Sequence, residues 1–156
     1  MWALCLVSVS LAHPTAQHGQ HQTASSVAET RALDLRRSST LEAILPELSR
    51  ARVVFVGERH DNYGHHLAQL DVIKRLHQLN PKIAVGMEMF QQPYQQFLDD
   101  FVAGSISEKE MLRGTEWYVR WRHDYRLYQQ VLQYAREQGI PVIALNLQRE
   151  ITDRVA

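Results

Sequence analysis

Residues 52–66 read RVVFVGERHDNYGHH, and the first part of this stretch decides the fold class. Residues 52–56 form a continuous apolar, β-branched run, which is typical of a strand buried on both faces of a parallel sheet. Two later runs have the same character, at 83–87 (IAVGM) and at 141–145 (PVIAL). We therefore expect three strands that are parallel and adjacent in one sheet.

The segments between these runs carry helical patterns. Apolar residues recur on one helical face in 64–79 and in 125–138. Ser39 and Glu42 have the spacing of a capping box, and Pro46 should keep the helix that they open short or kinked. Further helices are expected at 93–103 and from a second capping box, Ser107 and Glu110.

Strands that alternate with helices predict an α/β fold, in which a parallel β-sheet is flanked by helices. Three strands make a narrow sheet for such a domain. We therefore expect the chain to be an incomplete domain, truncated at its C-terminal end.

The charge balance is neutral, with 17 basic and 17 acidic residues among 156. A chain with a pI near 7.1 lacks the basic surface by which proteins bind nucleic acid. Nucleic acid is therefore not an expected partner.

The N-terminal part divides into two segments before the domain. Residues 1–12 are an apolar run too short to span a bilayer, and they end in Ser-Leu-Ala, which suits signal peptidase, although no Lys or Arg precedes the run. Residues 13–38 are polar and read as a disordered linker, and 39–156 form the α/β domain. We expect an exported protein, periplasmic or membrane-anchored as a lipoprotein. The single cysteine, Cys5, follows Leu4, which fits a lipidation site poorly.

Polar groups follow each predicted strand at its carboxyl end, where ligands bind in open parallel sheets. Glu58 and His60 follow the first strand, Glu88 the second, and Asn146 the third, with Arg149 three residues further on. We expect Glu58, His60, Glu88 and Asn146 to face a common space. Glu88 stands in an apolar run, where a carboxylate is costly unless it is paired or bound to a metal. A structural pair of Glu88 with Arg59 or Arg149 is the alternative.

Other candidate residues lie near the same edge of the sheet. His65 and His66 open the helix after the first strand and fall on its apolar arc, with His65 nearer the centre. Each is either a core histidine or a functional one. Residues 117–125 (WYVRWRHDY) combine aromatic rings with cations, which suits either a core patch or the binding of a flat macrocycle with carboxylates. Tyr128 and Tyr134 are expected in the core, whereas Tyr125 is freer to act as a ligand.

Four blocks in order, VGERHDNYGHH, AVGMEMF with its glutamine-rich tail, the Trp/Tyr segment and IPVIALNLQR, resemble the ChaN-like haem-binding uptake family. The resemblance covers residues 52–149. It implies an α/β fold, export, haem as the ligand, haem at a homodimer interface and an outer-membrane haem receptor as a partner. It also implies a tyrosine ligand to the haem iron and a histidine near the propionates. Tyr125 is the first candidate for the tyrosine, and a residue in the missing C-terminal part is the alternative.

The wider superfamily includes Tiki-type metalloproteases and erythromycin esterase-like hydrolases, whose shared feature resembles Glu58, His60 and a later carboxylate such as Glu88. Two functions therefore stay open. A haem carrier would use six residues for its cofactor: His60, His65, His66, Tyr125, Asn146 and Arg149. A hydrolase would use Glu58, His60 and Glu88 in catalysis, with His60 and His66 as acid/base groups or as ligands of a divalent metal.

Overall fold

The computed structural model describes residues 3–9, 39–152 and 154. A four-stranded sheet is formed by β1 (Ala3–Val9), β2 (Val53–Glu58), β3 (Ile83–Gln91) and β4 (Val142–Asn146), in the order β2-β1-β3-β4. The expected linker at 13–38 lies outside the described residues.

The strands β3 and β4 pair in parallel, as predicted, and β2 runs in the same direction as both, because β2 and β3 each pair antiparallel with β1. The predicted adjacency of β2 and β3 is wrong, since β1 lies between them. The cause is the apolar, β-branched composition of residues 3–9, which suits a strand as well as a signal segment. The signal-like interpretation of this segment stays a prediction.

The register across β1 aligns β2 and β3, so that residues 5–8 of β1 each have a residue of β2 on one side and a residue of β3 on the other. Val7 lies opposite Val54 on one side and Val85 on the other, and Cys5 lies opposite Val56 and Met87. Because side chains alternate between the faces of a sheet, Val54 and Glu58 of β2 point to the same side as Val85. This register directs the last side chain of β2 toward the helices.

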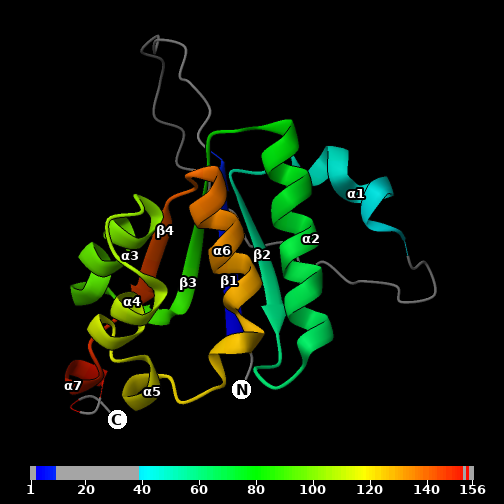
Figure 1. Ribbon diagram of the computed structural model, residues 1–156. Helices are drawn as coiled ribbons and strands as arrows, with labels where there is room; N and C mark the ends of the chain where they lie inside the picture. Colours follow the sequence, from blue (N-terminus) through cyan, green and yellow to red (C-terminus); the bar gives the residue numbers. More distant parts are fainter. Residues whose placement is uncertain (1–2, 10–38, 153, 155–156) are drawn as a thin grey trace, which may run out of the picture.

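Seven helices accompany the sheet in the part of the chain that the structure describes. Their bounds are α1 (Leu41–Leu48), α2 (Tyr63–Leu79), α3 (Gln95–Val102), α4 (Glu108–Gly114), α5 (Trp117–Arg120), α6 (Gln129–Gln138) and α7 (Arg149–Thr152), with 3₁₀ turns at Gln92–Tyr94 and Tyr125–Leu127. Figure 1 shows α5, α7 and the first turns of α2 and α6 at the end of the molecule toward which β2 and β4 point. That end is where the sequence predicts the site.

Local signals set several helix ends. Ser107 and Glu110 form the predicted capping box of α4, and α6 ends at Gly139 with φ of 64°. The capping box predicted at Ser39 is wrong, because Thr40 caps α1 and accepts the backbone N–H of Ala43. The second predicted strand, at 83–87, corresponds to β3, but β3 continues to Gln91, so Glu88 lies within a strand rather than after it.

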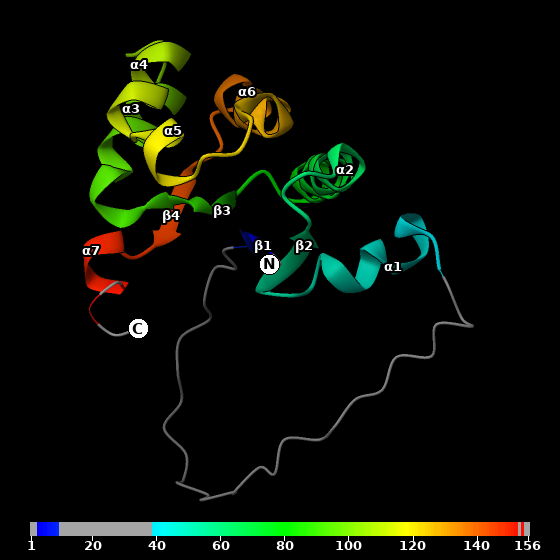
Figure 2. The same cartoon turned by 90° about the horizontal axis from the view of Figure 1, so that it is seen from below.

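The helices gather on one face of the sheet. Viewed from below, α2, α6 and the group α3 to α5 lie on the same side, and α1 lies beside β2 (Figure 2). The core lies between these helices and the strands and includes Val85, Leu98, Trp117 and Leu132. On the other face, the Phe55 side chain is 59% exposed. The predicted α/β class, a parallel β-sheet flanked by helices, is confirmed for β3 and β4 and their helices. Among the described residues, no helix is long and apolar enough to cross a membrane.

Candidate functional site

Glu58 is the centre of a buried polar cluster at the carboxyl end of β2. Its side chain is completely buried, which is unusual for a carboxylate. Its Oε1 accepts a hydrogen bond from Nδ1 of His60 at 2.9 Å and another from the Tyr128 hydroxyl at 3.2 Å. An ionised carboxylate only accepts hydrogen bonds, so we assign the imidazole proton of His60 to Nδ1. The last residue of β2, one residue of the following loop and the N-cap residue of α6 therefore hold each other in place.

His66 closes the cluster from the first turn of α2. Its Nε2 lies 3.7 Å from Oε2 of Glu58 and 3.3 Å from the carbonyl oxygen of His60. The side chain is 2% exposed, and its ring meets Tyr128 edge-on at 4.4 Å. His65, expected to be nearer the apolar centre, instead accepts the backbone N–H of Arg59 and helps to fix the loop. The deeper histidine is therefore His66, which is buried, whereas His65 is half-buried.

Two rings from the segment after α5 cover His60. The ring centroids of Trp121 and His123 each lie 4.6 Å from that of His60, and they lie 5.3 Å from each other. Burial, followed by the proximity of His60, lowers the pKa of His123. A neutral His123 therefore accompanies the Glu58–His60 pair at neutral pH.

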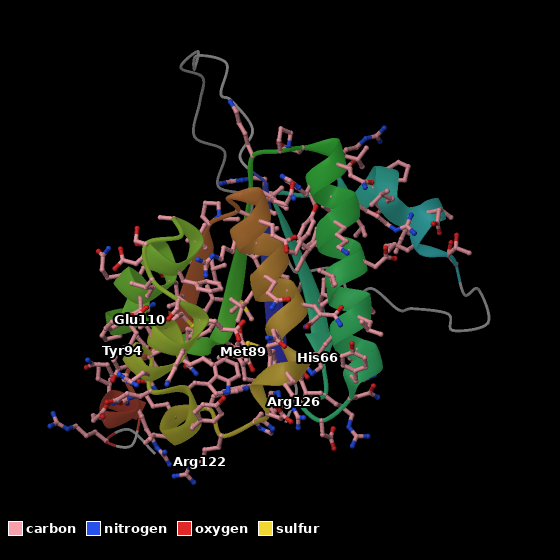
Figure 3. The ribbon with its side chains drawn as sticks, viewed as in Figure 1. His66, Met89, Tyr94, Glu110, Arg122 and Arg126 are labelled. Atoms are coloured by element: carbon pink, nitrogen blue, oxygen red, sulfur yellow. The ribbon has the colours of Figure 1, made fainter. Side chains whose placement is uncertain are left out.

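Four buried polar atoms in this cluster make no hydrogen bond. They are Oε2 of Glu58, Nε2 of His60, Nδ1 of His66 and Nε1 of Trp121. Because a buried polar atom without a partner costs free energy, such a concentration at one place marks a site built for a ligand rather than for stability. In Figure 3, His66 and Arg122 lie at the same end of the molecule, where the site is found.

A model of the family described as haem-binding uptake, Tiki superfamily, ChaN matches residues 44–156. The chain belongs to this family. The match covers the described elements from α1 to α7 apart from the first residues of α1, and it confirms the resemblance carried by the four sequence blocks. The family description indicates haem as the cofactor. Searches of curated proteins and of solved structures gave no significant match.

Glu88 and Asn146 meet beside this cluster. The Asn146 side-chain amide donates to the carbonyl oxygen of Glu88 at 3.2 Å, across the irregular end of the β3–β4 pairing. Burial raises the pKa of Tyr128, and the charges of Glu58 and Glu88 add to that effect. The negative charge of Glu88 therefore bears on the same hydroxyl that bonds Glu58. That all four predicted residues line one space stays a prediction, as does the role of Arg149 at the start of α7.

Tyr125 is placed differently from the freely accessible ligand that the sequence suggests. Its side chain is buried, and its hydroxyl donates to Oε2 of Glu108 at 3.1 Å. Burial, and then the charge of Glu108, raise the pKa of this hydroxyl. A tyrosine binds iron as the phenolate, so this environment opposes ligation.

No group of three or more His, Cys, Asp or Glu side chains within the described ranges is arranged to hold a metal ion. The two predicted metal ligands, His60 and His66, do approach each other, but Nδ1 of His60 is already bonded to Glu58. The divalent-metal alternative stays a prediction.

Sequence reasoning missed the role of Tyr128, which the helical pattern assigned to the core. It is buried as expected, but its hydroxyl reaches Glu58, seventy positions away in the chain. A usable signal was present: a buried tyrosine needs a hydrogen-bond partner, and Tyr128 stands at the start of α6, the end nearest the carboxyl ends of the strands.

Proposed function

We propose that this protein binds haem at the Glu58 cluster, where Nε2 of His60 would hold the iron. One observation carries the proposal. Nε2 is buried and makes no hydrogen bond, whereas Nδ1 of the same ring is bonded to Glu58. The lone pair is therefore on the nitrogen that lacks a partner.

This arrangement is the one that metal-bound histidines adopt. A ligating histidine usually donates its other N–H to a carboxylate or carbonyl, which fixes the tautomer and makes the free nitrogen a stronger donor. Glu58 fills that role for His60, and the Tyr128 hydroxyl and His66 fix Glu58 in turn. The ligand and its support are thus already formed.

The surroundings also suit the rest of a haem molecule. Trp121 and His123 offer aromatic surface beside His60, and a flat macrocycle stacks well on such rings. Arg59, between Glu58 and His60 in the chain, and Arg122, between Trp121 and His123, are exposed cations that can pair with propionates. Bound haem would supply the iron, while the chain supplies the ligand, its orientation and the exclusion of water.

Titration with ferric haem tests this proposal. We expect a shifted Soret band with the unaltered protein and the loss of that band in His60→Ala, because the ligating nitrogen is gone. His77→Ala is a matched control, since His77 also has its Nδ1 bonded to a side chain, the hydroxyl of Tyr134, but lies further along α2. Tyr125→Phe should leave the spectrum unchanged.

The two ligand candidates give opposite results in the same titration. Collapse of the spectrum in Tyr125→Phe with only modest weakening in His60→Ala would contradict our proposal and support tyrosine ligation. Absence of any saturable spectral change in the unaltered protein would contradict haem binding at this site altogether.

A second function, hydrolysis, is favoured by the unpaired Oε2 of Glu58 beside two histidines. Such a carboxylate can act as a general base once a substrate reaches it. Turnover of a chromogenic ester by haem-free protein, lost in Glu58→Gln, would support the hydrolase in place of the carrier.

We also propose that the protein is exported, as haem uptake requires, and that a homodimer or an outer-membrane receptor takes part. Cleavage after Ala12 would remove β1, and β2 and β3, already parallel and level, would then be free to pair directly. We expect intact-mass analysis of protein from its native cell to show an N-terminus near His13. Retention of Met1 without lipid would contradict export.

A further inference from the structure

Residues 118–124, which we call the strap, cross the site between two buried aromatic residues. Trp117 precedes the strap and Tyr125 follows it, and both side chains lie in the core, with their rings 5.5 Å apart. Every residue between them is exposed or half-buried. The strap is therefore a short surface segment fixed at both of its ends.

The strap covers the site. Its Trp121 and His123 rings contact His60, and the Glu58 carboxylate behind them has no exposed surface. A ligand larger than water cannot reach the unpaired Nε2 of His60 in this arrangement. Access to the site requires these two rings to move.

The strap is held in a strained conformation. Arg122 has φ of 70°, a left-handed conformation that non-glycine residues rarely adopt. Trp117, just before the strap, holds it at two points: its indole N–H donates to the carbonyl oxygen of His123, and its own carbonyl oxygen accepts the backbone N–H of Arg122. Strain of this kind persists only where surrounding contacts hold it, and it is typical of segments that switch.

Arg120 joins the strap to the end of β3 and to α7. Arg120 donates to the Gln91 amide oxygen at the end of β3 at 2.9 Å, and to Glu150 of α7 at 3.2 Å. It also donates to Glu116, just before α5, at 2.6 Å, and its guanidinium lies over the Tyr94 ring. These contacts tie α5 to the strand end and to α7, which lie together in Figure 1.

We propose that the strap is a lid over His60 and that Arg120 is its latch. Release of Arg120 from Gln91 and Glu150 lets the Trp121 and His123 rings move away from the His60 imidazole. Relief of the strained backbone conformation at Arg122 favours that movement. The identity of the admitted ligand as haem rests on the proposed function. The proposal that the strap opens does not depend on which ligand enters.

Chemical modification of His60 measures the opening without haem. Diethyl pyrocarbonate acylates an accessible neutral imidazole, and fragment-ion mass spectrometry, which distinguishes His60 from His65 and His66 in the same peptide, gives the rate for His60. We expect Arg120→Met to raise this rate about fivefold or more, the factor that loss of one modest interaction produces. Glu150→Gln should raise it less, and it should add little to Arg120→Met, because both changes release the same latch.

Arg75→Met is the matched control. Arg75 also bridges two carboxylates, Asp71 and Glu42, but it lies on α2 away from the strap. It should leave the His60 rate unchanged. Urea unfolding of each variant separates opening of the strap from global unfolding, and Glu150→Gln supplies the test if Arg120→Met does not fold.

Two results would overturn the lid. One is an unchanged rate of His60 modification in both latch variants, Arg120→Met and Glu150→Gln, when both are folded. The other is a His60 in the unaltered protein that reacts as fast as the half-buried His65. If the latch variants speed modification but haem never binds, the lid stands and the haem proposal fails. If haem binds through His60 with no effect of the latch, only the lid fails.

Discussion

Trp117→Ala should lower the free energy of unfolding by about 3–5 kcal/mol, the range for removal of a large buried aromatic side chain. The Trp117 ring is 1% exposed and contacts the rings of Phe90, Tyr125 and Tyr128 at 5.3–5.5 Å. Alanine would leave a cavity where the helices meet the sheet. It would also free the His123 carbonyl oxygen, which accepts the indole N–H.

Urea denaturation gives this free energy, and the next residue in the chain supplies the control. The Tyr118 side chain is 65% exposed, so Tyr118→Ala should change the stability by less than about 0.5 kcal/mol. A Trp117→Ala protein with nearly unaltered stability would show that the aromatic cluster is not part of the folded core. Because Trp117 anchors the strap, we also expect His60 in this variant to react faster with diethyl pyrocarbonate.

Glu58→Gln should weaken haem binding about 10- to 100-fold, the usual effect of removing the carboxylate partner of a metal-bound histidine. The substitution keeps the size of the side chain but removes its charge. The His60 N–H would then face a neutral amide, so Nε2 would be a poorer donor and the ring less firmly oriented. The measurement is haem titration followed at the Soret band.

Glu108→Gln is the control for this experiment. Glu108 also accepts a hydrogen bond from a tyrosine hydroxyl, that of Tyr125, and two more from the Gln129 amide, but no histidine donates to it among the described residues. Its substitution should leave haem affinity unchanged. Equal losses in Glu58→Gln and Glu108→Gln would show a general effect on the fold and would contradict the specific support of His60.

The sequence by itself located three of the four strands and five of the seven helices of the described residues, and the edge of the sheet at which Glu58 and His60 emerge. The apolar runs at 52–56, 83–87 and 141–145 located the strands at 53–58, 83–91 and 142–146, because local composition reports a buried strand directly. The position of Glu58 and His60 follows as well, because the residues after a parallel strand must emerge at its carboxyl end. The four sequence blocks also sufficed to indicate the family that the family model confirms.

Tertiary structure decided which of the candidate residues meet. Burial of Glu58, and its bond to Tyr128, depend on the register across the sheet and on where α6 begins, and neither is encoded in the neighbouring residues. The contacts of Trp121 and His123 with the His60 ring, and the hydrogen bond of Tyr125 to Glu108, likewise depend on the tertiary structure. The placement of residues 3–9 between β2 and β3 is the plainest example. A short apolar run suits a signal or a strand equally well, and only pairing with distant partners distinguishes the two.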